Sequence, residues 1–409
     1  MKNAVEKNNQ KSLEPIEKMN FVSLLETGNM QKIGQISIAV LSKGAQICSL
    51  GKDIYIVASS RYLQVFKYRD GVFSLGEAVD TGINSVYGDA LASITPDPKG
   101  LGCFLLRGGG SDYGKTVATY AKVNEDDLSI QYVVINPTMQ SRTYHAQSHF
   151  MYDDLIVSNT GDCVNGVLRI DREHMELTEV SATKIEKAHD TVKLSDSTIL
   201  VYSTGGNAKS WYLKLLRIDT DGTITEGTPT LMSATNSGIS HGRIILQLSN
   251  GSVYVPILGG NLFEVSYDLN TLDVTASSVP YVLPNYRYDV GNAICNVGDD
   301  LYHVSSDIKY VATNTYETSV TITGVQATSG GLNIQNKGTF KTETKIKYNY
   351  YPAITSEAGS PKCLICADKD IYACVMAPGY EIAKPGGKCN GISLNTVPRY
   401  SDNLKILGA

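Results

Sequence analysis

The chain has 409 residues, of which 42% are hydrophobic and 19% charged, and it contains 37 glycines and 25 tyrosines. This composition is typical of a globular chain rich in strands and turns, and it excludes wholesale disorder. The formal net charge of −5, without a basic stripe that could neutralise phosphates, argues against a nucleic-acid partner. No apolar run approaches the roughly 18–20 residues that a membrane span requires.

Residues 1–32 stand apart as an N-terminal arm, helical or extended. Ser12 is a candidate N-cap and Gly28 a candidate stop signal for a helix that includes residues 22–25. The arm either lies on the surface of the main domain or docks on a neighbouring subunit, and both interpretations stay open. The first ten residues are polar and lack an apolar signal core, so we expect synthesis in, and release from, a cytoplasm.

The helical period disappears from residue 33 onward, and turn-plus-strand units follow one another at intervals of about 45–60 residues. In these units a short polar turn leads into a run of apolar residues. The units start at Gly51, Asp97, Tyr152, Ser195, Ser249 and Gly298, with a seventh at Lys369. The interval is the length of a four-stranded blade.

Two further signals recur in step with these units. A glycine signal such as Gly205-Gly206 follows the strand in four of the units, where the chain needs a positive φ or a close approach of backbones. The next strand then ends in a polar turn, as in the Leu-Arg-Ile-Asp sequences at residues 168–171 and 216–219. A third apolar strand and an outer strand are thereby predicted in each of these units.

Four antiparallel strands per unit, repeated six or seven times, predict an all-β fold, a six- or seven-bladed β-propeller of four-stranded antiparallel blades. We expect the propeller to span residues 33–377 and residues 378–409 to form a C-terminal β tail that closes or anchors it. A strand near Ile36 is expected to pair with C-terminal strands and close the ring. A β-sandwich followed by a second β domain is the alternative, but it does not explain the repeated unit.

The order of signals in residues 85–275 resembles a kelch-type propeller blade. It runs from a histidine through a turn to Ile-Leu-Val-Tyr at residues 199–202, then to Gly205-Gly206 and a strand that ends in Asp219. The outer-strand Trp of the kelch pattern is missing throughout, and WD dipeptides and the Asp-box pattern of sialidases are absent. The resemblance implies a propeller used in protein–protein interaction.

The end of the chain carries a second resemblance. Residues 378–395 end in Gly-Ile-Ser-Leu-Asn, and residues 403–407 read Asn-Leu-Lys-Ile-Leu. This resembles the Gly-(Ile/Val)-Ala-Leu-Asn … Val-Lys-Val endings of tailed-phage fibre and appendage proteins. The resemblance implies a component of a phage virion.

The candidate site consists of polar residues on the innermost strands, which precede the turns described above. If the blades align, these side chains lie at one height around the central channel. The candidate binding residues at this end of the channel are Asp89, His145, His189, His241, Arg243, Arg287, Asp289 and Tyr350. The neighbouring tyrosines offer flat apolar faces with polar tips, which suit contact with a glycan or a protein.

Two interpretations of this set stay open. His145, His189 and His241 are of the residue type that binds a divalent metal through neutral imidazole, so a metal-dependent enzyme is one interpretation. The interpretation we favour is that such side chains satisfy backbone groups near the channel. Cys363 and Cys366 fall in a strand-like run and not in a zinc knuckle. The sequence therefore predicts no metal, no cofactor and no catalytic residue.

These observations favour a non-enzymatic structural or host-adsorption protein of a tailed bacteriophage, with the propeller as a docking or receptor-binding platform. The expected location is the virion, in multiple copies. The expected partners are other tail or capsid proteins and a glycan or protein of the host surface, with no nucleic acid and no membrane span. The alternatives are a metal-dependent propeller enzyme acting on polysaccharide and a cytoplasmic kelch-like interaction module.

Overall fold

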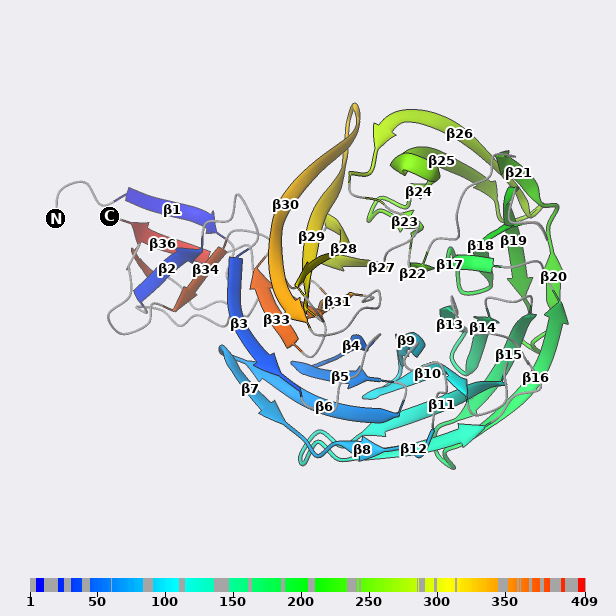
Figure 1. The fold of residues 1–409 in the computed structure, drawn as a ribbon, viewed down its shortest axis with the longest axis horizontal. Helices are drawn as coiled ribbons and strands as arrows, with labels where there is room; N and C mark the ends of the chain where they lie inside the picture. Colours follow the sequence, from blue (N-terminus) through cyan, green and yellow to red (C-terminus); the bar gives the residue numbers. More distant parts are fainter. Residues whose placement is uncertain are drawn as a thin grey trace.

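A computed structural model shows an all-β chain whose strands form a ring of seven blades and one further sheet (Figure 1). The structure describes residues 5–10, 21–25, 31–38, 45–59, 61–83, 91–109, 115–135, 147–160, 164–184, 188–204, 210–233, 241–242, 244–284, 286, 291–297, 300–312, 315–344, 352–358, 360, 362–367, 370–375, 379–382, 391–393 and 404–408. The prediction of six or seven blades is confirmed, and the number is seven.

Blades 1 to 4 follow the chain in order, from the innermost strand to the outermost. Blade 1 consists of β4 (Gln46–Gly51), β5 (Ile54–Ala58), β6 (Tyr62–Arg69) and β7 (Val72–Leu75), with β8 (Val79–Asp80) also on β6. Blade 2 consists of β9 (Leu91–Pro96), β10 (Gly102–Gly109), β11 (Lys115–Val123) and β12 (Ile130–Ile135). Blade 3 consists of β13 (Gln147–Met151), β14 (Leu155–Thr160), β15 (Val164–Asp171) and β16 (Glu176–Lys184). Blade 4 consists of β17 (Ala188–Lys193), β18 (Thr198–Thr204), β19 (Trp211–Ile218) and β20 (Ile224–Glu226), with β21 (Thr230–Ser233) also on β19.

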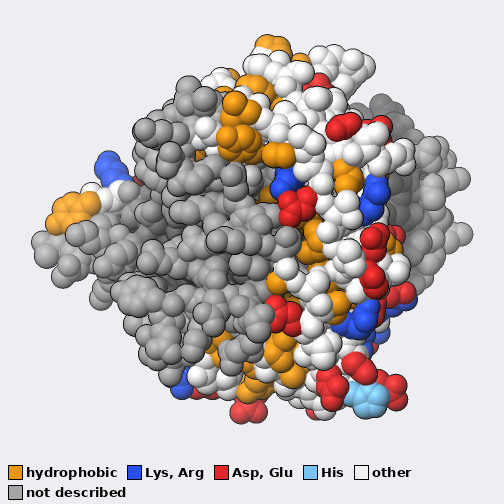
Figure 2. All heavy atoms as spheres, turned by 90° about the vertical axis from the view of Figure 1, so that its right-hand side faces the viewer, with side chains coloured by type: hydrophobic (Ala, Val, Ile, Leu, Met, Phe, Trp, Pro, Cys, Tyr) orange, Lys and Arg blue, Asp and Glu red, His pale blue; other side chains and the backbone are white. Residues whose placement is uncertain are grey.

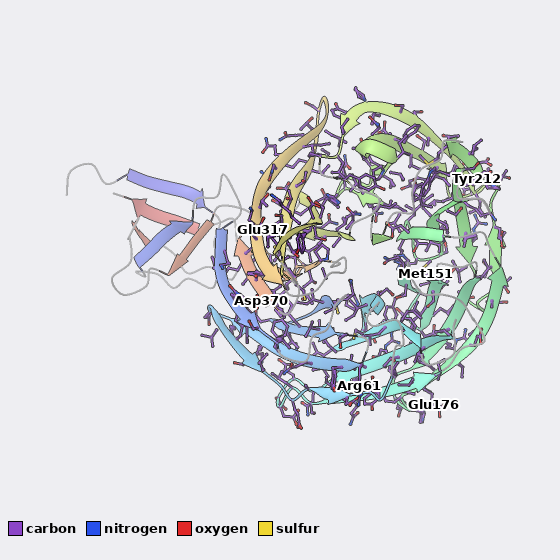
Figure 3. The ribbon with its side chains drawn as sticks, in the orientation of Figure 1. Arg61, Met151, Glu176, Tyr212, Glu317 and Asp370 are labelled. Atoms are coloured by element: carbon purple, nitrogen blue, oxygen red, sulfur yellow. The ribbon has the colours of Figure 1, made fainter. Side chains whose placement is uncertain are left out.

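Blades 5 to 7 complete the ring. Blade 5 consists of β23 (Leu246–Gln247), β24 (Val253–Pro256), β25 (Asn261–Asp268) and β26 (Asp273–Val282), with a 3-10 turn at Leu258–Gly260. Blade 6 consists of β27 (Gly291–Val297), β28 (Asp300–Ala312), β29 (Thr315–Thr328) and β30 (Gly331–Thr344), and the short β22 (His241–Gly242) pairs in parallel with β27. Blade 7 consists of β31 (Ala353–Thr355), β32 (Lys362–Ala367), β33 (Asp370–Val375) and β3 (Gln31–Ser37). Figure 3 shows the radial order in blade 3, with Met151 of β13 towards the centre and Glu176 of β16 at the rim.

The N-terminal strand closes the ring. β3 pairs antiparallel with β33, from Gln31 opposite Val375 to Ser37 opposite Asp370, and the Ser37 hydroxyl donates a hydrogen bond to the Asp370 carboxylate. The predicted closure through the strand at Ile36 is therefore confirmed, since Ile36 lies opposite Ile371. Because β3 supplies the outermost strand, the C-terminal segment contributes only three strands to blade 7.

That division explains one error in the predicted repeat. The repeat predicts that the seventh unit, starting at Lys369, supplies the second strand of its blade, as the corresponding units do elsewhere. The second strand of blade 7 is instead β32, and β33 is the third. The strand position that this turn-plus-strand unit has in the other blades does not apply to blade 7, because blade 7 is built from both ends of the chain.

The remaining strands form a terminal sheet beside the ring, next to β3 and β33 in the view of Figure 1. Its strand order is β1 (Val5–Gln10), β36 (Leu404–Gly408), β35 (Gly391–Ser393), β2 (Phe21–Leu25) and β34 (Gly379–Ile382). The helix predicted over residues 22–25 is wrong, because Phe21–Leu25 pairs on both sides with C-terminal strands. Residues 13–20 of that predicted helix lie outside the described part of the chain.

The hydrophobic core is divided among the boundaries between blades. Seven clusters of buried residues are found in the described part, and they match the seven neighbouring pairs of blades. In β5, Ile54 and Ile56 face blade 2 while Tyr55 and Val57 face blade 7. Both faces of a blade are thus covered, which is why the inner strands are continuous apolar runs in the sequence.

Candidate functional site

The predicted channel residues fall mostly outside the described part of the chain. This applies to Asp89, His145, Arg243, Arg287, Asp289 and Tyr350. The backbones of His189 and His241 are described, in β17 of blade 4 and in β22 beside β27 of blade 6, and these two strands lie close to each other. Whether these side chains converge on the channel stays a prediction. The site can nevertheless be built from the other polar residues on the inner strands.

Polar side chains on neighbouring inner strands bond to each other across the blade boundaries, and we call this set the inner-strand seam. Between blades 2 and 3, the hydroxyl groups of Ser93 and Ser148 lie 2.8 Å apart, and Thr95 donates to the Ser148 carbonyl at 2.8 Å. Between blades 3 and 4, His149 Nε2 lies 2.9 Å from the hydroxyl oxygen of Thr191 and 3.1 Å from its carbonyl oxygen. These bonds hold adjacent blades in register.

Asp190 carries the seam from blade 4 to blade 5. Its side chain lies on β17, and the residue is 1% exposed. One carboxylate oxygen accepts the backbone N–H groups of Ile244 at 2.6 Å and Ile245 at 2.7 Å, and the other accepts the N–H of Thr191 at 2.8 Å. Hydrogen bonds from backbone N–H groups offset the cost of burying the charge, so this carboxylate fixes the approach to β23.

The seam continues at two further places. In β23, Gln247 donates a side-chain hydrogen bond to the Lys193 carbonyl at 3.2 Å. At the closure of the ring, the hydroxyl of Thr355 in blade 7 accepts the backbone N–H of Ser49 in blade 1 at 2.9 Å. The described seam therefore crosses four of the boundaries, including the one between the first and last blades.

Blade 6 contains a buried histidine that sequence analysis did not select. His303 on β28 is fully buried, and its Nε2 lies 2.9 Å from the side-chain oxygen of Asn292 on β27. Burial lowers the pKa of His303 to about 4, because the apolar surroundings disfavour the charged imidazolium. His303 is therefore neutral at physiological pH, and its contact lies within one blade.

A second polar network joins blades 2 and 3 through the turns that connect their strands. Asp97, with a fully buried side chain, accepts two hydrogen bonds from Arg172 at 2.6 and 2.8 Å and one from the Tyr120 hydroxyl at 2.6 Å. Burial alone would raise the pKa of Asp97, but the hydrogen bonds from Arg172 and Tyr120 outweigh it and lower the pKa. Burial and the Asp97 carboxylate raise the pKa of Tyr120, so the phenol stays protonated.

The repeated Leu-Arg-Ile-Asp sequences have a structural use. Arg169 donates to the Thr220 carbonyl of blade 4 at 3.1 Å, and Arg217 donates to the Asn270 carbonyl of blade 5 at 3.0 Å. The aspartate that ends the first motif, Asp171, accepts backbone N–H groups two and three residues ahead and so caps its own turn. Each arginine thus reaches the turn of the next blade, which explains why the motif recurs.

The chemistry that these residues can support is limited. Within the described ranges, no group of three or more His, Cys, Asp and Glu side chains is placed to hold a metal ion. The side chains of His145, His189 and His241 lie outside the described part of the chain, so the alternative three-histidine metal site stays untested. Figure 2 shows acidic and basic side chains interspersed over the described atoms of the face it draws, without a basic stripe among them. In the part of the chain that is described, no helix has the length and apolar character needed to cross a bilayer.

Comparison with known proteins places the fold but not the activity. No family model matches the sequence, and no curated protein matches it. The periplasmic gluconolactonase of Pseudomonas aeruginosa is similar in structure, with a TM-score of 0.50 and 12% identity over 94% of this chain and 99% of that one. A putative 6-phosphogluconolactonase of Bacteroides fragilis gives a TM-score of 0.48 and 12% identity over 83% and 97% of the two chains. The C-terminal WD40 domain of Sif2 gives a TM-score of 0.48 and 9% identity over 86% of this chain and 99% of that one.

At such identities the likeness shows the fold alone. The class of protein is therefore a seven-bladed β-propeller with four-stranded antiparallel blades, as the sheet topology also shows. The kelch-type and phage-fibre resemblances seen in the sequence stay predictions. A propeller scaffold serves many functions, so function has to be argued from the residues.

Proposed function

We propose that this chain is a non-enzymatic docking platform, and more specifically a structural or host-adsorption component of a tailed-phage virion. The observation that carries the proposal is the inner-strand seam. Ser148, His149, Asp190 and Thr355 all hydrogen-bond a neighbouring blade, so these polar groups serve to hold a rigid ring together. A rigid ring with loops at its ends is suited to presenting a binding surface.

The terminal sheet supports the second part of the proposal, that the platform is anchored by the two ends of the chain together. Gln31 of β3 and Val375 of β33 are register partners at the edge of the ring. β2 precedes β3 and β34 follows β33, and these two strands pair with each other in the terminal sheet. The anchor is thus an arm and a tail joined in one sheet, and its partners are other tail or capsid proteins.

The virion assignment rests on the sequence of residues 378–409, whose pattern resembles the endings of phage fibre proteins. It is tested by mass spectrometry of purified virions from the source of the gene, together with the position of the gene among portal, tail and fibre genes. Recovery of the chain in purified particles in multiple copies is expected. Its absence from the particles would overturn the virion assignment.

The role of the terminal sheet is tested with the full chain. Val22 of β2 pairs with both Ile382 and Gly391, so Val22→Pro removes a ladder hydrogen bond inside the sheet. We expect this variant to keep a folded propeller and to lose binding to particles that lack the protein. Val22→Thr, which keeps the N–H group and a β-branched side chain, is the matched control. Equal binding by the proline variant would contradict anchoring through this sheet.

Enzymatic alternatives are separated by two measurements on the purified chain. A metal-dependent enzyme using His145, His189 and His241 requires a stoichiometric transition metal in elemental analysis. A lactonase, the activity named for the propeller of Pseudomonas aeruginosa, requires hydrolysis of gluconolactone above the uncatalysed rate. The platform proposal expects neither result. A partner recovered from host lysate, with no particle association, would favour the kelch-like interaction module instead.

A further inference from the structure

Two thiols face each other in the core of blade 7. Cys363 on β32 and Cys374 on β33 are register partners in the antiparallel ladder, and they are 2% and 0% exposed. Both belong to the hydrophobic cluster between blades 6 and 7. The neighbouring Cys374 and burial raise the pKa of the Cys363 thiol, and the Cys374 thiol lies 4.0 Å from the Tyr372 carbonyl oxygen.

The alternation of side chains along β32 decides which cysteines can meet. Cys363 and Ile365 point towards blade 6, whereas Leu364 and Cys366 point towards blade 1. Cys374 lies on the blade 6 side, so Cys363 is its partner and Cys366 is on the opposite face of the sheet. Cys295 of β27 packs on the same cluster from blade 6 and is partly exposed.

We propose that Cys363 and Cys374 form a site of covalent modification at which a peroxide-class oxidant produces a cross-strand disulfide. Directly opposed residues of an antiparallel pair have Cα atoms about 4.5–5.5 Å apart, which is within the range of about 4.4–6.8 Å that a disulfide spans. The bond therefore needs only side-chain rotation and small shifts of the strands.

The reaction balances with hydrogen peroxide as the oxidant. Peroxide converts one thiol to a sulfenic acid and leaves as water. The second thiol then attacks the sulfenic sulfur, the S–S bond forms and a second water leaves. The two thiols lose two electrons and two hydrogens in total, and one peroxide takes them up.

The bond would act on the closure of the ring. β33 pairs with β32 on one side and with β3 on the other. A disulfide between β32 and β33 holds in place the strand on which the N-terminal segment closes the propeller. Since the loop between the two cysteines is short, we expect the oxidised protein to unfold at a temperature roughly 3 °C higher than the reduced protein.

Peptide mapping of the full chain tests the proposal without a substitution. The reduced protein is treated with hydrogen peroxide, remaining thiols are alkylated after unfolding, and the chain is digested with trypsin without reductant. Lys369 lies between the two cysteines, so the peptide of residues 363–369 and a peptide starting at Asp370 are separated by cleavage. We expect these two peptides to be recovered as one species, two hydrogens lighter than their sum, with the link on Cys363.

Cys366 provides the matched control because it sits in the same tryptic peptide. Cys366→Ser should keep the linked species and the thermal shift, and Cys374→Ala should lose both. Recovery of Cys363 and Cys374 as alkylated thiols under conditions that oxidise Cys295 would overturn the proposal. A link between Cys366 and Cys374 would also overturn it, because that link requires the opposite face of β32.

Discussion

Replacing Asp190 by alanine should destabilise the propeller strongly, without any need to invoke catalysis. The substitution removes the acceptor for three backbone N–H groups, those of Thr191, Ile244 and Ile245. The residues that carry these groups are 4%, 1% and 5% exposed, so water reaches them poorly. A buried donor left unsatisfied costs about 1–3 kcal/mol. The segment before β23 can relax in part, so we expect the free energy of unfolding to fall by about 3–5 kcal/mol.

The measurement is the free energy of unfolding from equilibrium urea denaturation, followed by the fluorescence of Trp211, which is 3% exposed in the cluster between blades 4 and 5. Asp196→Ala is the control, since its carboxylate is 80% exposed and pairs with Lys193 at the surface. The control should behave as wild type. If the free energy of unfolding of Asp190→Ala falls by less than about 1 kcal/mol, the carboxylate does not hold blades 4 and 5 together. A functional role would then be the better explanation for this buried carboxylate.

Three further predictions concern other buried positions. Arg172→Met leaves the buried Asp97 carboxylate without its paired cation, and a loss of about 2–3 kcal/mol in unfolding free energy is expected. His303 has a pKa of about 4 when folded and near 6.5 when unfolded, so its contribution to stability is complete above pH 6.5 and falls as the pH drops towards 4, by roughly 3 kcal/mol in all. Gly227→Ala would place a Cβ atom 2.2 Å from a backbone oxygen of the next blade, at an expected cost of about 1–3 kcal/mol, whereas Gly100→Ala meets open space and should be neutral.

Each of these predictions has an outcome that would contradict it. Lys52→Met, which breaks an exposed pair with Glu125, should leave stability unchanged, and an effect as large as that of Arg172→Met would point to a general charge effect. His303→Gln should flatten the stability profile between pH 4 and 6.5, and a profile unchanged from wild type would assign the slope to other groups. Equal stabilities for the two glycine variants would argue against close packing of the blade 4 edge on blade 5.

The repeat could be predicted from the sequence because each blade uses the same local signals. Turns and apolar runs recur from blade to blade, and the Leu-Arg-Ile-Asp ending recurs in blades 3 and 4 because its arginine bonds to a turn of the following blade, as Arg169 and Arg217 do. What could not be predicted is how the two ends of the chain combine. β2 pairs with strands more than 350 residues further along, and no local pattern in residues 21–25 separates a strand from a helix there.

The candidate site was predicted less well than the fold, for a related physical reason. The sequence favours histidines as candidates because imidazole has distinctive chemistry, and nothing in it distinguishes Asp190, the neighbour of His189. Its role depends on the N–H groups of Ile244 and Ile245, which are brought to it by the packing of blade 5 on blade 4. Spacing alone cannot show that a carboxylate will face backbone donors 54 and 55 residues away.

The position of the closing strand connects attachment with stability. β3 follows β2 of the terminal sheet along the chain and pairs with β33, so a pull on the terminal sheet is transmitted to the strand that closes the ring. Antiparallel pairing of β3 with β33 over Gln31 to Ser37, and the Ser37–Asp370 hydrogen bond, resist such a pull. β2 leads into β3, β33 leads into β34, and β2 and β34 are paired in the same sheet. A force on that sheet therefore acts on β3 and β33 together and does not separate one from the other. In the proposed role as an anchor, a sheet made from both ends of the chain would therefore protect the closure of the ring.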